Sequence, residues 1–142
     1  MSKQTQQSSN YQQILEERGS GALAEKLGIT IIEASPELTI ATMPVEGNTQ
    51  PMGLLHGGAS AAFAETVGSL SAYLSVANQN KAAVGVDLNI THLRSVRSGT
   101  VTATCKAVKL GRTVCVHAID ITDEAHKLVA TARITNNIID LP

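Results

Sequence analysis

Apolar and polar residues follow two different periods along this chain, and they predict strands on either side of one long helix. Residues 29–45 are rich in β-branched side chains and break at residues 35–37, Ser-Pro-Glu, which indicates a hairpin. Residues 56–77 contain no proline and much alanine, and they predict a helix roughly 30 Å long. More β-rich segments follow, and over residues 100–107 apolar side chains alternate with threonine and lysine. That period of two is typical of a strand with one buried face.

The order of these elements predicts an α+β domain. We expect a curved antiparallel sheet of about five to six strands to wrap one central helix. Residues 110–112 and 123–125 are expected at hairpin tips. The many small residues of the helix should allow the strands to approach it closely.

The start of the chain is different in character. Residues 1–10 are polar and low in complexity, so we expect a disordered tail over 1–10 and a single domain over 11–142. Residues 11–28 predict one or two short helices with a break at residues 19–21, Gly-Ser-Gly.

The central helix carries one formally charged side chain, Glu65, between Gly47 and Asn80. Residues four and seven positions apart share a helix face, so Glu65 lies at the centre of a small and partly polar stripe. The stripe consists of Gly58, Ala61, Glu65, Ser69 and Ala72. The opposite face is expected to form the core and consists of Phe63, Val67, Leu70 and Leu74. A poorly solvated carboxylate costs free energy unless something pairs with it or uses it. Its alternative role is structural, as a hydrogen-bond acceptor for a loop.

The sequence His56-Gly57-Gly58 opens this helix, where backbone N–H groups lack partners and carry partial positive charge. Gly57 and Gly58 are therefore candidate donors to a carbonyl oxygen that gains negative charge. Gly57 and Glu65 are eight residues apart, so their backbones lie about 12 Å apart along the helix. If both are catalytic, two antiparallel helices from two subunits must supply them, and a dimer then has two equivalent sites.

Composition excludes several classes of partner. The 142 residues carry a net charge of −1, which favours neither nucleic acid nor an anionic membrane. No apolar run approaches the roughly 20 residues of a membrane span, and the first ten residues do not resemble a signal peptide. We therefore expect a cytoplasmic protein. Cys105 and Cys115 are expected to be buried, reduced thiols. The four histidines show no zinc spacing, so we predict no metal.

Residues 50–69, QPMGLLHGGASAAFAETVGS, resemble the active-site segment of hotdog-fold acyl-CoA thioesterases. The nearest group is the phenylacetate-pathway type, with the glutamate-dependent 4-hydroxybenzoyl-CoA and 1,4-dihydroxy-2-naphthoyl-CoA thioesterases. The likeness runs from about Leu27 to the C-terminus and includes residues 88–99, LNITHLRSVRSG. The combination of Gln, His-Gly-Gly and Glu at these spacings is specific, whereas His-Gly-Gly alone is not. The resemblance implies a single hotdog thioesterase domain.

The same resemblance implies hydrolysis of an acyl-CoA thioester, with an aryl-CoA favoured, to free acid and CoA, with no cofactor. Glu65 matches the catalytic carboxylate, which acts as nucleophile or as general base on water. Gly57 matches the residue whose backbone N–H polarises the thioester carbonyl, and Gln50 and His56 match residues that orient the thioester or the water. Thr66 and Ser69 match hydroxyl positions that line the substrate site. Members of the group are dimers or dimers of dimers, with Glu and the Gly and Gln pair on different subunits.

Cations are expected at the CoA phosphates, because arginine can clasp a phosphate with two hydrogen bonds. The candidates are His92, Arg94, Arg97, Lys109 and Arg112. Each of them is also compatible with ordinary charge on a solvated strand end.

Other functions stay open at this point. The fold also suits a non-catalytic module that binds or senses acyl-CoA, and a dehydratase in which His56 and Glu65 are the acid and base. Thioesters on a carrier protein are an alternative to CoA thioesters. The acyl group and the pathway do not follow from the sequence.

Overall fold

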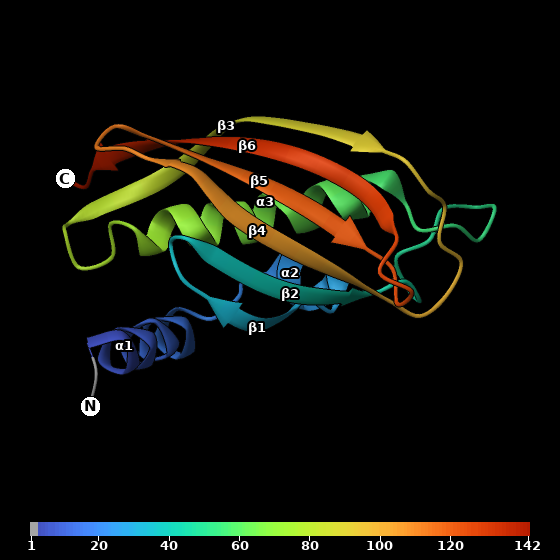
Figure 1. Cartoon of the computed structure of the whole chain (residues 1–142), viewed down its shortest axis with the longest axis horizontal. Helices are drawn as coiled ribbons and strands as arrows, with labels where there is room; N and C mark the ends of the chain where they lie inside the picture. Colours follow the sequence, from blue (N-terminus) through green and yellow to red (C-terminus); the bar gives the residue numbers. More distant parts are fainter. Residues whose placement is uncertain (1–2) are drawn as a thin grey trace.

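One long helix lies against a six-stranded antiparallel sheet that curves around it (Figure 1). The structure is a computed structural model and describes residues 3–142. Its elements are α1 (Lys3–Arg18), α2 (Ala22–Leu27), β1 (Thr30–Ala34), β2 (Leu38–Pro44), α3 (Gly57–Leu74), β3 (Lys81–His92), β4 (Thr100–Leu110), β5 (Val114–Thr122) and β6 (Leu128–Asp140). The predicted α+β architecture, the central helix and the hairpin breaks are confirmed.

The strand order is β1-β2-β4-β5-β6-β3, and every neighbouring pair is antiparallel. The connection from β2 through α3 carries the chain across the sheet, so among the described residues β3 pairs only with β6 and forms an edge. β3 is also irregular, because its register with β6 shifts between Gly85 and Asp87. The twelve residues of β3 thus leave one side of a long strand free for hydrogen bonding.

The core forms where α3 packs on the sheet. Phe63, Val67, Leu70 and Leu74 are buried, as the spacing of apolar residues predicted. Gly68 lies on the same buried side, and a Cβ atom at this position would overlap the Cγ2 methyl of Ile134 in β6. The small residue therefore sets how closely the helix approaches the strand, and the predicted close approach is confirmed.

Helix α1 begins at Lys3, so the structure describes a helix in the polar region for which the sequence predicted disorder. Its residues include no proline, and side chains four positions apart contact each other: Gln7 Nε2 donates to the Tyr11 hydroxyl at 3.2 Å, and Gln13 Nε2 to Glu17 Oε1 at 2.9 Å. The Arg18 guanidinium lies 4.1 Å from the ring centroid of Tyr73 in α3, which holds the end of α1 against the domain. The predicted break after α1 is confirmed.

Both cysteines are buried and free, as predicted. Burial raises the pKa of the Cys105 thiol to about 11, and a hydrogen bond with Ser71 partly opposes the shift. A thiol with such a pKa carries very little thiolate at neutral pH, which makes Cys105 a poor nucleophile.

His117 on β5 is a buried polar residue that sequence analysis did not single out. Its side chain is completely buried, and its Nε2 lies 2.8 Å from the carbonyl oxygen of Pro36. A carbonyl only accepts, so Nε2 carries the proton, and within residues 3–142 Nδ1 has no partner. Burial lowers the pKa of His117 below its ordinary value of 6.5, while the Pro36 carbonyl and the charge of Glu37 act in the opposite direction.

This burial predicts a loss of stability in acid. Because the folded pKa lies below 6.5, the unfolded chain binds the proton more readily, and the free energy of unfolding falls as pH drops below 6.5. Urea denaturation from pH 8 to pH 5 should show a weaker pH dependence for His117→Gln than for the wild-type protein. Equal slopes in the two proteins would mean that His117 does not contribute.

Candidate active site

The loop between β2 and α3 contains Gln50 and ends at His56, which lies at the start of the helix. Asn48, which is buried, fixes this loop: its Nδ2 donates to the carbonyl oxygens of Leu27 at 2.7 Å and Pro44 at 2.8 Å. The backbone N–H of His56 in turn donates to the Asn48 carbonyl at 2.9 Å. Gln50 is held locally, since its Oε1 accepts from the backbone N–H of Met52. The loop therefore presents both residues from a fixed backbone.

His56 is the N-cap of α3, and its capping hydrogen bond makes the backbone N–H groups of the two following glycines differ. Its Nδ1 accepts from the backbone N–H of Gly58 at 2.8 Å, so that N–H is already used. Within residues 3–142 the backbone N–H of Gly57 has no protein acceptor. The His92 ring lies over Gly57, and an added Cβ would come within 3.0 Å of His92 Nε2. Of the two candidate donors, Gly57 is the one left for a ligand, and its missing side chain keeps the approach open.

Glu65 lies half-buried on the same helix, above strand β3. Its Oε1 accepts from the Ser69 hydroxyl at 3.4 Å, and Ser69 Oγ is also 3.3 Å from Oδ1 of Asn136 on β6. A Cβ atom at Gly85 would overlap Glu65 Oε1, so the carboxylate occupies space that only a glycine leaves free. The Thr66 hydroxyl instead donates to the Ala62 carbonyl at 2.7 Å. The stripe predicted from the sequence thus includes a carboxylate with a defined position.

The structure brings only some of the predicted site residues together. His56, Gly57 and His92 lie together at the first turn of α3, Gln50 lies in the loop before it, and Glu65 lies eight residues further along the helix. That spacing corresponds to about 12 Å along the axis. Within one chain the predicted residues at the start of α3 therefore lie apart from Glu65.

The five candidate cations also divide between the two ends of α3. His92, Arg94 and Arg97 are exposed at the end where α3 begins, and Arg97 Nη1 donates to the Met52 carbonyl at 3.2 Å. Lys109 and Arg112 lie at the β4–β5 turn, and Arg112 borders a cavity with Ser75 and Val76 beyond the other end of α3. Within one chain these cations do not form a single patch.

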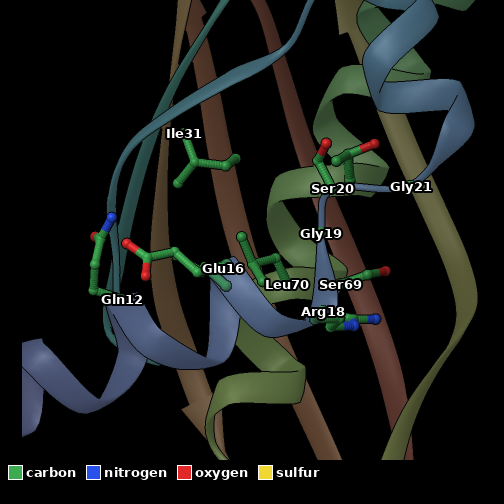
Figure 2. A pocket seen from close by; sticks show the side chains of 11 residues that line it. Gln12, Glu16, Arg18, Gly19, Ser20, Gly21, Ile31, Ser69 and Leu70 are labelled. Carbon is green, nitrogen blue, oxygen red and sulfur yellow. The ribbon is translucent and has the colours of Figure 1, made fainter.

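A cavity of about 510 Å³ lies between α1 and α3 (Figure 2). Thr66, Ser69 and Leu70 of α3 form one side of it, and residues of α1 and the turn after it form the other. The remaining lining residues are Gln12, Leu15, Glu16, Arg18, Gly19, Ser20, Gly21 and Ile31. Sequence analysis missed the α1 residues, because nothing in their pattern indicates which part of α3 they lie against. The cavity borders the Glu65 carboxylate through Ser69.

Over residues 3–142, no group of three or more His, Cys, Asp or Glu side chains is placed to hold a metal ion. No helix in that range combines the length and the hydropathy of a membrane span.

Comparison with known proteins places these features in a family. Residues 52–130 match the family described as the thioesterase superfamily. The chain is 40% identical over 122 residues to 1,4-dihydroxy-2-naphthoyl-CoA hydrolase of Escherichia coli, covering 85% of this chain and 89% of that protein. It is 41% identical over 120 residues to the proofreading thioesterase EntH of Cronobacter sakazakii, covering 84% and 87%. The crystal structure of a thioesterase from Haemophilus influenzae matches with a TM-score of 0.82 and 44% identity over 89% of each chain. These findings agree with the resemblance stated from the sequence.

Gly85→Ala should displace the Glu65 carboxylate without unfolding the protein. The added Cβ meets the far end of a flexible side chain, so Glu65 moves and loses its contact with Ser69. Alanine is also better tolerated than glycine in a strand, so the free energy of unfolding should change by less than about 1 kcal/mol. A crystal structure and urea denaturation of the variant check both points. An unmoved carboxylate would show that Gly85 is not what gives it room.

Proposed function

This chain belongs to the thioesterase superfamily, and we propose that it hydrolyses an acyl-CoA thioester, with an aryl acyl group favoured, to free acid and CoA. The observation that carries the proposal is the pair of complementary groups on α3. One is a positioned, half-buried carboxylate at Glu65, and the other is a backbone N–H at Gly57 that has no acceptor among residues 3–142. Thioester hydrolysis needs such a pair, because one group attacks and the other stabilises the oxygen that becomes negative.

The chemistry of the pair allows two routes. As a nucleophile, a Glu65 oxygen attacks the thioester carbon, CoA leaves as thiolate, and water then cleaves the resulting anhydride. As a general base, Glu65 takes a proton from water, and the hydroxide adds to the same carbon before the thiolate leaves. In both routes the Gly57 N–H binds the carbonyl oxygen, and Gln50 and His56 orient the thioester or the water.

The site is complete only between two subunits in this proposal. A single α3 separates Gly57 from Glu65 by about 12 Å, whereas both must come within about 3 Å of one carbonyl group. An antiparallel pair of α3 helices brings Gly57 of one subunit to Glu65 of the other, at two equivalent sites. The free edge of β3 supports the pairing, because Val84 and Val86 there are 44% and 54% exposed. A second copy would cover both the unpaired backbone and these side chains.

We assign the acyl group to the cavity between α1 and α3. Its volume of about 510 Å³ lies in the range of small-ligand sites, and Leu15, Ile31 and Leu70 give it apolar walls. The CoA phosphates would contact His92, Arg94 and Arg97 near the start of α3. Lys109 and Arg112, at the opposite end of the helix, would contribute only from the other subunit.

A thioester on a carrier protein is the second candidate substrate. The similarity to a proofreading thioesterase favours it, and the exposed start of α3 would also accept a thioester presented on a carrier's flexible arm. Assays of kcat/KM with benzoyl-CoA and with a benzoyl-carrier protein distinguish the two substrates. The preferred substrate is the one with the higher value.

Glu65→Gln should reduce thiol release from benzoyl-CoA by about a thousandfold, because the amide neither attacks nor accepts a proton. Its fold should persist, since an amide oxygen still accepts from Ser69. Glu33→Gln, at an exposed position on β1, is the matched control and should keep full activity. A folded Glu65→Gln protein with wild-type turnover would contradict the assignment.

Gly57→Pro tests the backbone donor, because proline removes the N–H and is favoured at the first position of a helix. His56 has φ −68° and ψ 129°, a conformation that a following proline accepts. Gly57→Ala is the control: it adds a Cβ toward His92 but keeps the N–H. We expect kcat to fall about a hundredfold more in Gly57→Pro than in Gly57→Ala. Equal loss in the two variants would exclude the N–H as the donor.

Mixing Glu65→Gln and Gly57→Pro subunits tests the shared site. Each heterodimer has one site with both groups intact, so random exchange should restore about a quarter of wild-type activity. If each site lies within one subunit, mixing two inactive proteins restores nothing.

A further inference from the structure

Asn136 occupies a position in β6 that the fold otherwise gives to apolar residues. Its neighbours on the inward face are Ala132, Ile134 and Ile138, all of which are buried. Asn136 itself is completely buried, and within residues 3–142 its Nδ2 has no hydrogen-bond partner. Burying an amide with an unpaired donor costs free energy, so packing alone does not explain an asparagine at this position.

The contacts of Asn136 lead to the catalytic carboxylate. Its Oδ1 lies 3.3 Å from Ser69 Oγ, which in turn lies 3.4 Å from Glu65 Oε1. Asn136 is also the register partner of Gly85, whose missing side chain makes room for the same carboxylate. The β3–β6 ladder and one turn of α3 thus surround Glu65 with a glycine, a serine and an asparagine.

The number of available protons decides which group donates and which accepts in this series of contacts. The Ser69 hydroxyl has one proton, and it cannot donate to Glu65 and to an amide oxygen at once. An amide can present either its oxygen or its nitrogen to a neighbour, and the hydrogen-bond network decides between them. With the nitrogen toward Ser69, Asn136 donates to Ser69 Oγ and the Ser69 proton goes to Glu65. This orientation gives a buried N–H an acceptor and gives the carboxylate a fixed donor.

We propose that Asn136 is a positioning residue for thioester hydrolysis, which acts on Glu65 through Ser69. It directs the Ser69 proton to Glu65 Oε1 and so keeps the carboxylate in its attacking orientation. The proposal rests on the proposed function of Glu65, but Asn136 touches neither the substrate nor the reacting atoms. Its effect should therefore depend entirely on Ser69.

A double-mutant cycle on the full-length protein tests this dependence with benzoyl-CoA as substrate. Asn136→Ala should lower kcat about tenfold, as expected for one lost hydrogen bond to a charged network, with KM unchanged. Ser69→Ala should lower kcat at least as much. The double variant should match Ser69→Ala alone, because both changes interrupt one chain of contacts. Asn137→Ala, at the neighbouring exposed position, is the control and should keep wild-type kcat.

Additive losses in the double variant would overturn the proposal, and so would wild-type kcat in a folded Asn136→Ala protein. A second measurement needs neither turnover nor a change at Asn136. NMR of the assigned Asn136 side-chain amide should show shifted N–H signals in Ser69→Ala and in Glu65→Gln. Unshifted signals in both variants would exclude the chain of contacts. If the wild-type protein hydrolyses no thioester, the proposed function fails, while this NMR result still decides the role of Asn136.

Discussion

One carboxylate on an otherwise uncharged helix is the constraint on which the structure of this site depends. A charge that is short of water must be paired or used, and no cation of the described chain forms an ion pair with Glu65. Its hydrogen-bond partner is the Ser69 hydroxyl, and Ser69 connects it to a buried amide on β6. The sheet beneath it provides space through Gly85. Ser69 thus gives the carboxylate at position 65 a donor, and Gly85 gives it room.

At three glycines the missing side chain serves three different purposes. Gly68 lets α3 approach Ile134, and its role is packing. Gly85 leaves space for the carboxylate, and Gly57 leaves a backbone N–H open beneath the His92 ring. Sequence analysis identified Gly57 from its place at the start of the helix. It did not identify Gly85, because the function of that residue depends on a side chain twenty positions away that folding brings above it.

The sequence predicted the fold because the relevant signals are local. The period of two in the strands, the proline-free helix and the turn residues all lie within short windows. The stripe on α3 also follows from local spacing, and so Glu65 and Ser69 were identified. Asn136, His117 and the α1 lining of the cavity depend on which strand lies beside which helix, and no local pattern contains that information. The polar composition of residues 1–10 suggested a disordered tail, and the contact that holds the other end of α1, between Arg18 and Tyr73, forms only in the folded domain.

In the proposed function, one part of the chain carries the reacting groups and another part carries the acyl cavity. The groups assigned to the reaction lie on α3 and the loop before it, and they are held by backbone capping, by Asn48 and by the sheet. The cavity assigned to the acyl group lies between α3 and α1 (Figure 2), and the far wall belongs to a helix attached through few contacts. Substitutions on α1 can therefore reshape the acyl cavity without moving Glu65 or Gly57. A change on α3 affects both, because its polar face carries the carboxylate while its apolar face forms the core.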